Sequence, residues 1–397
     1  MPDHKRMSVM TLVLPLSMII GTTWLASVAV GQSTSKAPSV QQLLQEYTRA
    51  LDATQSFTDT FEEVDDFSHK TTPAQPRAEV GRQFKRGRNR ADGKRIYCQK
   101  YMWGHFNQQE KKLPEDKPRY HLRIEADKKQ YVHSKAINNP HEKGSAGLQP
   151  SMVETPRLNM ETFAGIYGHV GCDKRLDAVL AAAKKISVRP ATENINGFPC
   201  HVIDADTEYG RYTVWLDPAH GYNAARVTRK ATGGDKEHEW PMPPGDHASG
   251  SVLVTRFEQV TGIWVPVEAE HETNYTSGRL FRRSRSHYKR ANIVLNPDHD
   301  KLGSFDIPLL ENPANDPELK DETRVQILLP SSVWVKATWK DGKVVDESGK
   351  VINISELWAT SKSPSPNTNA SNSNRSNRPG SSSRPNRSNS SRRRRAY

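Results

Sequence analysis

Short motifs of catalysis and metal binding are missing from this chain of 397 residues. It has no Gly-x-Ser-x-Gly turn, no Walker-type phosphate loop and no His-Glu-x-x-His pair, the patterns of serine hydrolases, nucleotide-binding proteins and zinc proteases. The run Asp298-His299-Asp300 lies in a turn-like stretch, and we do not expect it to hold a metal ion. The sequence therefore predicts a protein that is not an enzyme and has no cofactor.

Cysteine is scarce, because Cys98, Cys172 and Cys200 are the only three in the chain. None forms a Cys-x-x-Cys pair, so neither a redox motif nor a zinc knuckle is indicated. In an exported protein the simplest arrangement is one disulfide with one thiol left over. All three pairings remain open.

Long apolar runs are also lacking, with one exception at the N-terminus. Hydrophobic residues make up 35% of the chain, and the mean hydropathy is -0.77. Lys5 and Arg6 precede the apolar run Leu12–Ile20, and the small residues Ala29–Gly31 follow it. This pattern is typical of a secretory signal peptide, so we predict that residues 1–31 are removed near Gly31 and that the protein is exported to the periplasm or cell envelope. An uncleaved N-terminal anchor is the alternative, although a Gly-Thr-Thr break interrupts the run.

Acidic residues are absent from the end of the chain. Residues 361–397 carry nine Lys and Arg, so subtracting nine from the net charge of +12 leaves +3 for the rest. The Ser-, Asn- and Arg-rich segment 359–397 has too little apolar surface to fold, and we expect it to be disordered. It would bind an anionic envelope surface, or serve only as a solubilising tail. The proposed basic arm consists of Arg392, Arg393, Arg394 and Arg395. Apart from Tyr397, the segment 359–397 has no aromatic residue that could stack on a base, so no specific nucleic acid partner is predicted.

Strand patterns are what the chain has in quantity. Helical spacing is limited to Ser39–Ala53, where Ser39 and Gln42 suit a capping box, to Asp173–Ile186 and to a third candidate, Asn159–His169. Almost everything from Gly197 onward alternates with the period of a strand. The sequence therefore predicts an α+β fold that is mostly β.

Two hairpins define the later half of this pattern, Tyr212–Tyr222 and Val252–Val267. Asp217 and Pro218 suit the first turn, since proline presets φ there, and Thr261-Gly262 suits the second. His220 lies in the first turn, where we expect it to be solvated.

A shorter β segment follows a linker rich in Asn, Pro and Asp. Val325–Leu329 and Val333–Lys340 have strand character, and Asp341-Gly342 is a strong hairpin turn. Residues 311–358 are therefore predicted to be a linker with a small β-hairpin extension, as a separate unit or as extra strands on the main sheet.

Four local patterns resemble the periplasmic lipoprotein-carrier superfamily, which includes LolA, LolB and RseB-like proteins. They are Phe57-Thr-Asp-Thr-Phe61 after the first helix, Trp215-Leu-Asp-Pro-Ala-His-Gly221, Gly262-Ile-Trp-Val-Pro266 and Phe305-Asp-Ile-Pro308. The resemblance covers about residues 37–310. It implies a half-open antiparallel β-barrel, a curved sheet plugged by two or three helices, whose concave face receives acyl chains.

Aromatic residues on the predicted strands are the main candidates for a ligand site. They would either pack in the core or line a cavity for a lipid or an acylated protein, and they are Phe57, Phe61, Tyr97, Tyr101, Trp103, Tyr212, Trp215, Phe257 and Trp264. The function we expect is non-enzymatic binding of a lipid or acyl chain by a monomer. The alternatives are an RseB-like sensor or protein-interaction module, and an unrecognised secreted hydrolase.

Overall fold

The structure is a computed structural model, and the residues that it describes are 38–70, 78–106, 111–112, 118–126, 129–137, 144–150, 174–237, 240–302, 305–311 and 313–361. Several predictions lie outside these residues: the signal peptide, the helix at Asn159–His169, Cys172, and the basic arm Arg392–Arg395. They stay predictions.

The first helix, α1 (Val40–Asp52), begins at the predicted capping box. The backbone N–H of Gln42 donates to the Ser39 hydroxyl at 3.2 Å, and the Ser39 N–H donates to the Gln42 side chain at 2.9 Å. These two bonds satisfy N–H groups that have no partner within the helix. One face of α1 then buries Leu43, Tyr47 and Leu51.

Strands make up most of the described chain, and eighteen of them join in one sheet. In chain order they are β1 (Ser56–Lys70), β2 (Glu79–Asp92), β3 (Ile96–Phe106), β4 (Lys111–Lys112), β5 (Arg119–Ala126), β6 (Lys129–Ala136), β7 (Ser145–Pro150), β8 (Lys185–Val188), β9 (Glu193–Ile195), β10 (Phe198–Thr207), β11 (Gly210–Asp217), β12 (Asn223–Thr232), β15 (His247–Val260), β16 (Ile263–Ser277), β17 (Leu280–Leu295), β18 (Arg324–Leu328), β19 (Trp334–Lys340) and β20 (Lys343–Val345). The short strands β13 (Lys236–Glu237) and β14 (Trp240–Pro241) pair only with each other.

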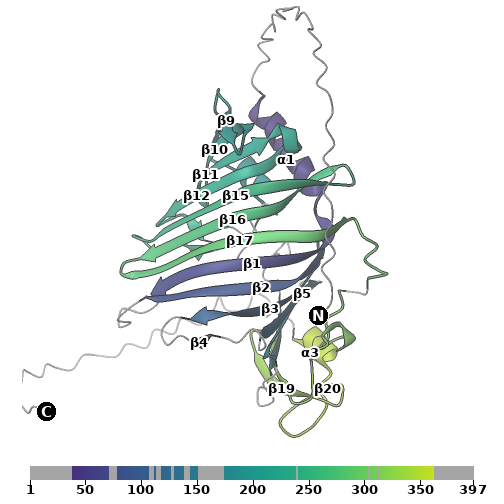
Figure 1. The fold of residues 1–397 in the computed structure, drawn as a ribbon. Helices are drawn as coiled ribbons and strands as arrows, with labels where there is room; N and C mark the ends of the chain where they lie inside the picture. Colours follow the sequence, from purple (N-terminus) through teal and green to yellow (C-terminus); the bar gives the residue numbers. More distant parts are fainter. Residues whose placement is uncertain are drawn as a thin grey trace, which may run out of the picture. The chain divides into compact units, whose positions relative to one another are not determined.

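The order of the strands in space differs from their order in the chain. From β10, which pairs with β8 and β9, the sheet runs through β11, β12, β15, β16 and β17 to β1, and then through β2, β3, β5, β6 and β7 to β18, β19 and β20 (Figure 1). Neighbours are antiparallel except β7 and β18. The predicted mostly-β fold, a curved and unclosed antiparallel sheet with few helices, is confirmed.

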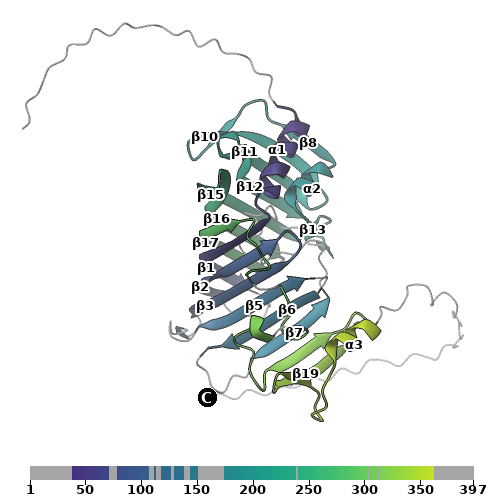
Figure 2. The same ribbon diagram turned by 90° about the vertical axis from the view of Figure 1, so that its right-hand side faces the viewer.

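Two large cores lie on opposite faces of this sheet. On β3, Ile96 and Cys98 belong to the first core, whereas Tyr97 belongs to the second. Successive side chains of a strand point to opposite faces, so the two cores are separated by the sheet itself. The helices α1 and α2 (Leu176–Ala181) pack on the first core, and α3 (Ile354–Thr360) packs on the second (Figure 2).

The C-terminal β segment consists of extra strands on the main sheet. Arg324 to Ile327 of β18 pair in parallel with Ser145 to Leu148 of β7, and β19 and β20 continue from β18. Phe305, Ile307 and Leu309, which precede these strands, are buried in the second core. Of the two alternatives left by the sequence, pairing with the sheet is therefore the one that is observed.

The predicted disulfide is not found at the two cysteines that the structure describes. Cys98 and Cys200 are free, buried thiols on opposite faces, in the first core and in a small core with Val202, Trp215 and Ala225. Strand alternation and packing placed them apart, which spacing along the chain could not show. Burial raises the pKa of Cys98 to about 11 and that of Cys200 to about 12.

These thiols should resist alkylation in the folded protein. A raised pKa means that the reactive thiolate is a minor species at pH 8, and burial blocks access as well. Peptide mapping after treatment with iodoacetamide should find Cys98 and Cys200 unmodified in buffer and fully modified in denaturant. Equal labelling in both conditions would contradict the buried positions.

Candidate functional site

Four rings meet where the ends of three hairpins come together, and we call this group the hairpin-end cluster: Phe198, His220, Phe257 and Trp264. The His220 ring stacks on Phe257 with centroids 4.5 Å apart. Its edges meet Phe198 and Trp264, each at 4.7 Å in a T-shaped arrangement. Two of the predicted ligand-binding residues, Phe257 and Trp264, are thus brought together around a histidine.

A short turn holds His220 in this position. Between β11 and β12, the helical turn η1 (Pro218–His220) is capped by Asp217, whose side chain accepts from the Ala219 N–H at 2.9 Å. The same carboxylate lies 2.6 Å from His220 Nδ1. Gly221 follows with φ of 66°, a left-handed conformation that glycine adopts without steric cost. The expectation that His220 is solvated is wrong, because its side chain is only 12% exposed.

The cluster is reachable from solvent, although its centre is packed. Phe198 is 40% exposed, and Phe257 and Trp264 are half-buried. The Asn223 side-chain amide ties the turn to its neighbour, since it donates to the carbonyls of His220 at 2.8 Å and Trp264 at 3.1 Å. The result is a fixed aromatic surface on the end of the sheet.

The other predicted aromatic residues are distributed over both faces. Phe57, Phe61 and Tyr212 are fully buried in the first core. Tyr97 is buried in the second core, and Tyr101 is half-buried against it.

Two tryptophans complete the predicted set. Trp215 points away from Tyr212 into the small core with Cys200, and its Nε1 donates to Glu193 Oε2 at 2.8 Å. Trp103 is half-buried and stacks with Phe84 at 6.3 Å. The nine residues therefore do not line one common cavity.

A buried ion-pair cluster lies beside the first core, and the sequence reading missed it. We define it as Asp59, Glu63, Lys85, Asn89 and Arg290, all at most 3% exposed. Lys85 Nζ lies 2.7 Å from Glu63 Oε1, and Arg290 Nε lies 2.7 Å from Asp59 Oδ2. The Asn89 amide donates to Asp59 Oδ1 at 2.9 Å.

The sequence signal for this cluster was strand alternation. Asp59 and Glu63 have the same parity as Phe57 and Phe61, so they share the face that is covered by the core. A run of acidic residues such as that from Glu62 to Asp66 is usually a solvated strand end, but Glu63 is only 2% exposed. Charged residues are rarely buried unless they are paired, and here they are paired.

A second buried polar group surrounds Asp316 in the second core. Its carboxylate accepts from the hydroxyls of Tyr120 at 3.1 Å and Tyr131 at 2.7 Å, and it lies 2.7 Å from His133 Nδ1. The Glu318 N–H also donates to it, at 3.1 Å. Because a carboxylate only accepts, Nδ1 of His133 carries the hydrogen.

The Tyr, His and Asp types in this group are those of acid–base catalysis, but their burial prevents that role. His133, Tyr120 and Tyr131 have no exposed surface, and Asp316 is 2% exposed. Burial, followed by the charge of Asp316, holds the pKa of Tyr131 well above its ordinary value. The group therefore joins the C-terminal segment to β5 and β6 rather than contacting a substrate.

The described part of the chain offers neither a candidate metal cluster nor a candidate membrane-spanning helix. Within those residues, no group of three His, Cys, Asp or Glu side chains is placed to hold a metal ion. No helix in the same described ranges has the length and apolarity needed to span a membrane.

Comparison with known proteins gives distant matches among solved structures alone. No family model matches the chain, and no curated protein matches its sequence. Among solved structures, a DUF1329 family protein from Desulfovibrio piger is 13% identical over 66% of this chain and 94% of its own, with a TM-score of 0.31. A LolA superfamily protein from Nitrosomonas europaea is 10% identical over 68% and 98%, with a TM-score of 0.32.

A further match is the complex of MucA and MucB from Pseudomonas aeruginosa, which is 8% identical over 64% of this chain and 99% of the other, with a TM-score of 0.21. Sequence identities and TM-scores this low say nothing about the ligand or the activity of this chain. The Nitrosomonas europaea protein carries the name of the superfamily that the sequence motifs resemble.

Proposed function

We propose that this is a non-enzymatic protein of the cell envelope that holds a lipid or acyl chain, and that the chain contacts the hairpin-end cluster. The observation that carries the proposal is the half-buried pair Phe257 and Trp264, held beside Phe198 around one histidine whose side chain is 12% exposed. Each CH₂ group that an acyl chain buries contributes about 0.8 kcal/mol. Aromatic surface that is already partly dehydrated suits such a chain.

The rigidity of the cluster supports binding. His220 contacts three rings and Asp217, and the Asn223 amide fixes both adjoining backbones. Side chains that are ordered before binding lose little conformational entropy when a ligand arrives. Side chains of a mobile aromatic patch would lose more conformational entropy on binding, and the ligand would bind more weakly.

The first core is a less suitable site for the same ligand. Phe57 and Tyr212 pack in one core with Leu43 and Tyr47 of α1, so a ligand that reached them would have to displace the helix. The buried ion-pair cluster shares that face, so an acyl chain placed there would lie against charged side chains. The hairpin-end cluster is reached from solvent without displacing a helix.

Replacement of Phe257 and Trp264 together by alanine should weaken acyl binding roughly 10-fold or more. Burial of a large apolar side chain contributes about 1.5–3 kcal/mol, about half of that remains for a half-buried ring, and 1.4 kcal/mol corresponds to a factor of ten. Displacement of a fluorescent fatty acid measures the affinity, and native mass spectrometry of the full chain detects co-purified lipid.

Trp334→Ala is the matched control, because Trp334 is 56% exposed on β19, far along the sheet order from β15 and β16. It should leave the affinity within twofold of the parent. If the double variant binds like the parent while its thermal unfolding is unchanged, the hairpin-end cluster is not the site. If the parent binds no lipid at all, the proposal fails.

Protein interaction is the second candidate, and the turn before β19 favours it. Val333 and Trp334 are 54% and 56% exposed and adjacent, and exposed aromatic residues often anchor protein interfaces. Chemical crosslinking in envelope extracts should then capture a defined partner with the parent but not with Trp334→Ala. Capture that is insensitive to this change would count against the second candidate.

A further inference from the structure

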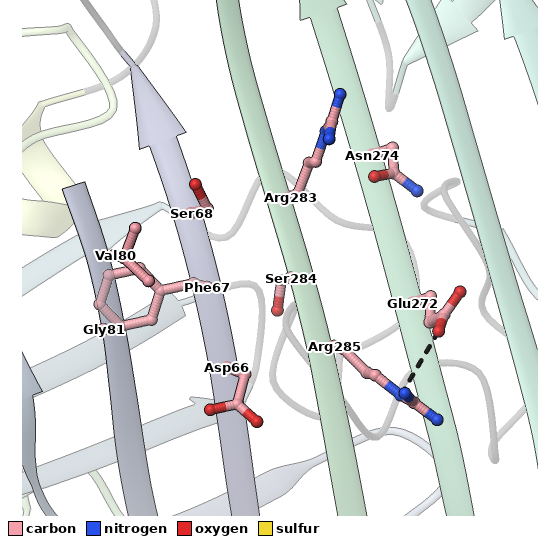
Figure 3. A pocket seen from close by; sticks show the side chains of 10 residues that line it. All are labelled: Asp66, Phe67, Ser68, Val80, Gly81, Glu272, Asn274, Arg283, Ser284 and Arg285. Atoms are coloured by element: carbon pink, nitrogen blue, oxygen red, sulfur yellow. Dashed lines mark ion pairs between the residues drawn. The ribbon is translucent and has the colours of Figure 1, made fainter. Parts of the chain in front are cut away.

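A pocket of about 480 Å³ lies at the opposite end of β16 from Trp264. It is lined from four adjacent strands, as Figure 3 shows. The lining residues are Asp66, Phe67, Ser68, Val80, Gly81, Glu272, Asn274, Arg283, Ser284 and Arg285. Arg283 and Asn274 have the opposite parity to Tyr288 and Ala269 of the first core, so they lie on the other face of the sheet.

Two cross-strand rows of side chains line this pocket, and one of them is already paired. In that row the register places Glu272, Arg285 and Asp66 side by side. Arg285 Nη2 lies 2.8 Å from Glu270 Oε2, and Arg285 Nε lies 3.4 Å from Glu272 Oε1. Asp66 binds Arg82 through two bonds of 2.6 and 2.8 Å.

The other row contains a cation and no acid. The register places Asn274, Arg283 and Ser68 side by side on β16, β17 and β1. Arg283 has no ion pair with any residue in the described ranges, and its guanidinium lies 5.3 Å from the centroid of the Phe281 ring. Stacking on an aromatic ring orients a guanidinium. The row thus offers a guanidinium fork, an amide and a hydroxyl.

Further cations surround this end of the sheet. Lys70 lies at the end of β1, and Arg279 lies in the turn just before β17. Nearby, His69 Nε2 lies 2.8 Å from Glu79. Positively charged side chains favour the approach of an anion, even though Arg285 is shared between two glutamates.

We propose that Arg283, Asn274 and Ser68 bind a phosphate group. An arginine fork matches two oxygens of a phosphate, and a phosphate keeps further oxygens for the amide and the hydroxyl, whereas the two oxygens of a carboxylate are taken up by the fork. Val80, which is 51% exposed, lies opposite Ser68 in the register and lines the same pocket. An apolar neighbour favours a phosphate that carries apolar groups, as in a phospholipid headgroup. The site does not rest on the proposed function.

Arg283→Gln in the full chain tests the site, and Arg285→Gln is the matched control on the same strand. Cosedimentation with vesicles of phosphatidylcholine containing phosphatidylglycerol measures the lipid source, and calorimetric titration with inorganic phosphate measures the free ion. We expect Arg283→Gln to lower the affinity at least 5-fold, and Arg285→Gln to change it less than twofold. Asn274→Asp, which sets a carboxylate beside Arg283, should act like Arg283→Gln.

The outcomes separate the sources. A loss with vesicles alone assigns the site to a headgroup, and a loss with inorganic phosphate alone assigns it to the free ion. Equal losses in Arg283→Gln and Arg285→Gln, or none in either, would overturn the proposal. The basic tail is the same in all variants, so its contribution to the affinity cancels in this comparison. Thermal unfolding checks that each variant is folded, and binding of the fatty acid should be unchanged.

Discussion

Replacement of Arg290 by methionine should lower the free energy of unfolding by about 3–5 kcal/mol, since one partner of a buried ion pair is removed and the other stays behind. Arg290 is 3% exposed, and its Nε lies 2.7 Å from Asp59. Its Nη1 also donates to the Pro266 carbonyl at 3.2 Å. Methionine keeps an apolar stem near Phe57 but leaves the Asp59 carboxylate without this cation.

Arg285→Met on the same strand is the control. Arg285 pairs with Glu270 in solvent, with side chains 63% and 38% exposed, and exposed pairs contribute little to stability. Urea unfolding followed by fluorescence gives both values, provided that the slopes stay equal.

Adding Asp59→Asn to Arg290→Met should restore part of the loss, because the uncompensated charge disappears. A loss for Arg290→Met as small as that for Arg285→Met would show that the pair is not buried in solution.

Replacement of Asp316 by alanine should also cost about 3–5 kcal/mol. Four donors converge on this carboxylate, from Tyr120, Tyr131, His133 and the Glu318 backbone. Each buried donor left without an acceptor costs about 1–3 kcal/mol, and relaxation reduces their sum. Urea unfolding measures the change, with the exposed Asp300→Ala as a control that should stay within about 0.5 kcal/mol.

Limited proteolysis locates the damage in Asp316→Ala. Because Asp316 joins the chain before β18 to β5 and β6, its loss should expose β18 and β19 first. Faster cleavage there, with β10–β12 still protected, is the expected pattern. Uniform cleavage along the chain would contradict a local role.

Local features were predictable because they depend on neighbours in sequence. The capping box of α1 and the turns at Asp217-Pro218 and Thr261-Gly262 came from residues a few positions apart. Strand alternation predicted the sheet and most hairpins. The helix expected over Asp173–Ile186 is shorter, since α2 ends at Ala181 and β8 begins at Lys185, where pairing with β10 outweighs helix propensity.

The candidate site was only partly predictable. Strand alternation indicates Phe257 and Trp264 as aromatic residues on strands, but the position of His220 in a turn predicts a solvated side chain and not the ring that joins them. Its burial depends on Phe198, which reaches it from another hairpin. Asp316 lies 183 positions from its partner His133, and no pattern within the linker indicates such a contact.

The amino-acid sequence by itself determined that this chain forms a mostly-β protein with a capped first helix, because hydrogen-bonding turns and alternation act over a few residues. Only the tertiary structure decided which face of each strand is covered and by what. That choice separates the Phe57 core from the half-buried Trp264, leaves Arg283 in a row without an acid, and buries Glu63 and Asp316 among their partners. Burial and pairing are set by contacts between strands far apart in the chain, and such contacts exist only once the sheet has formed.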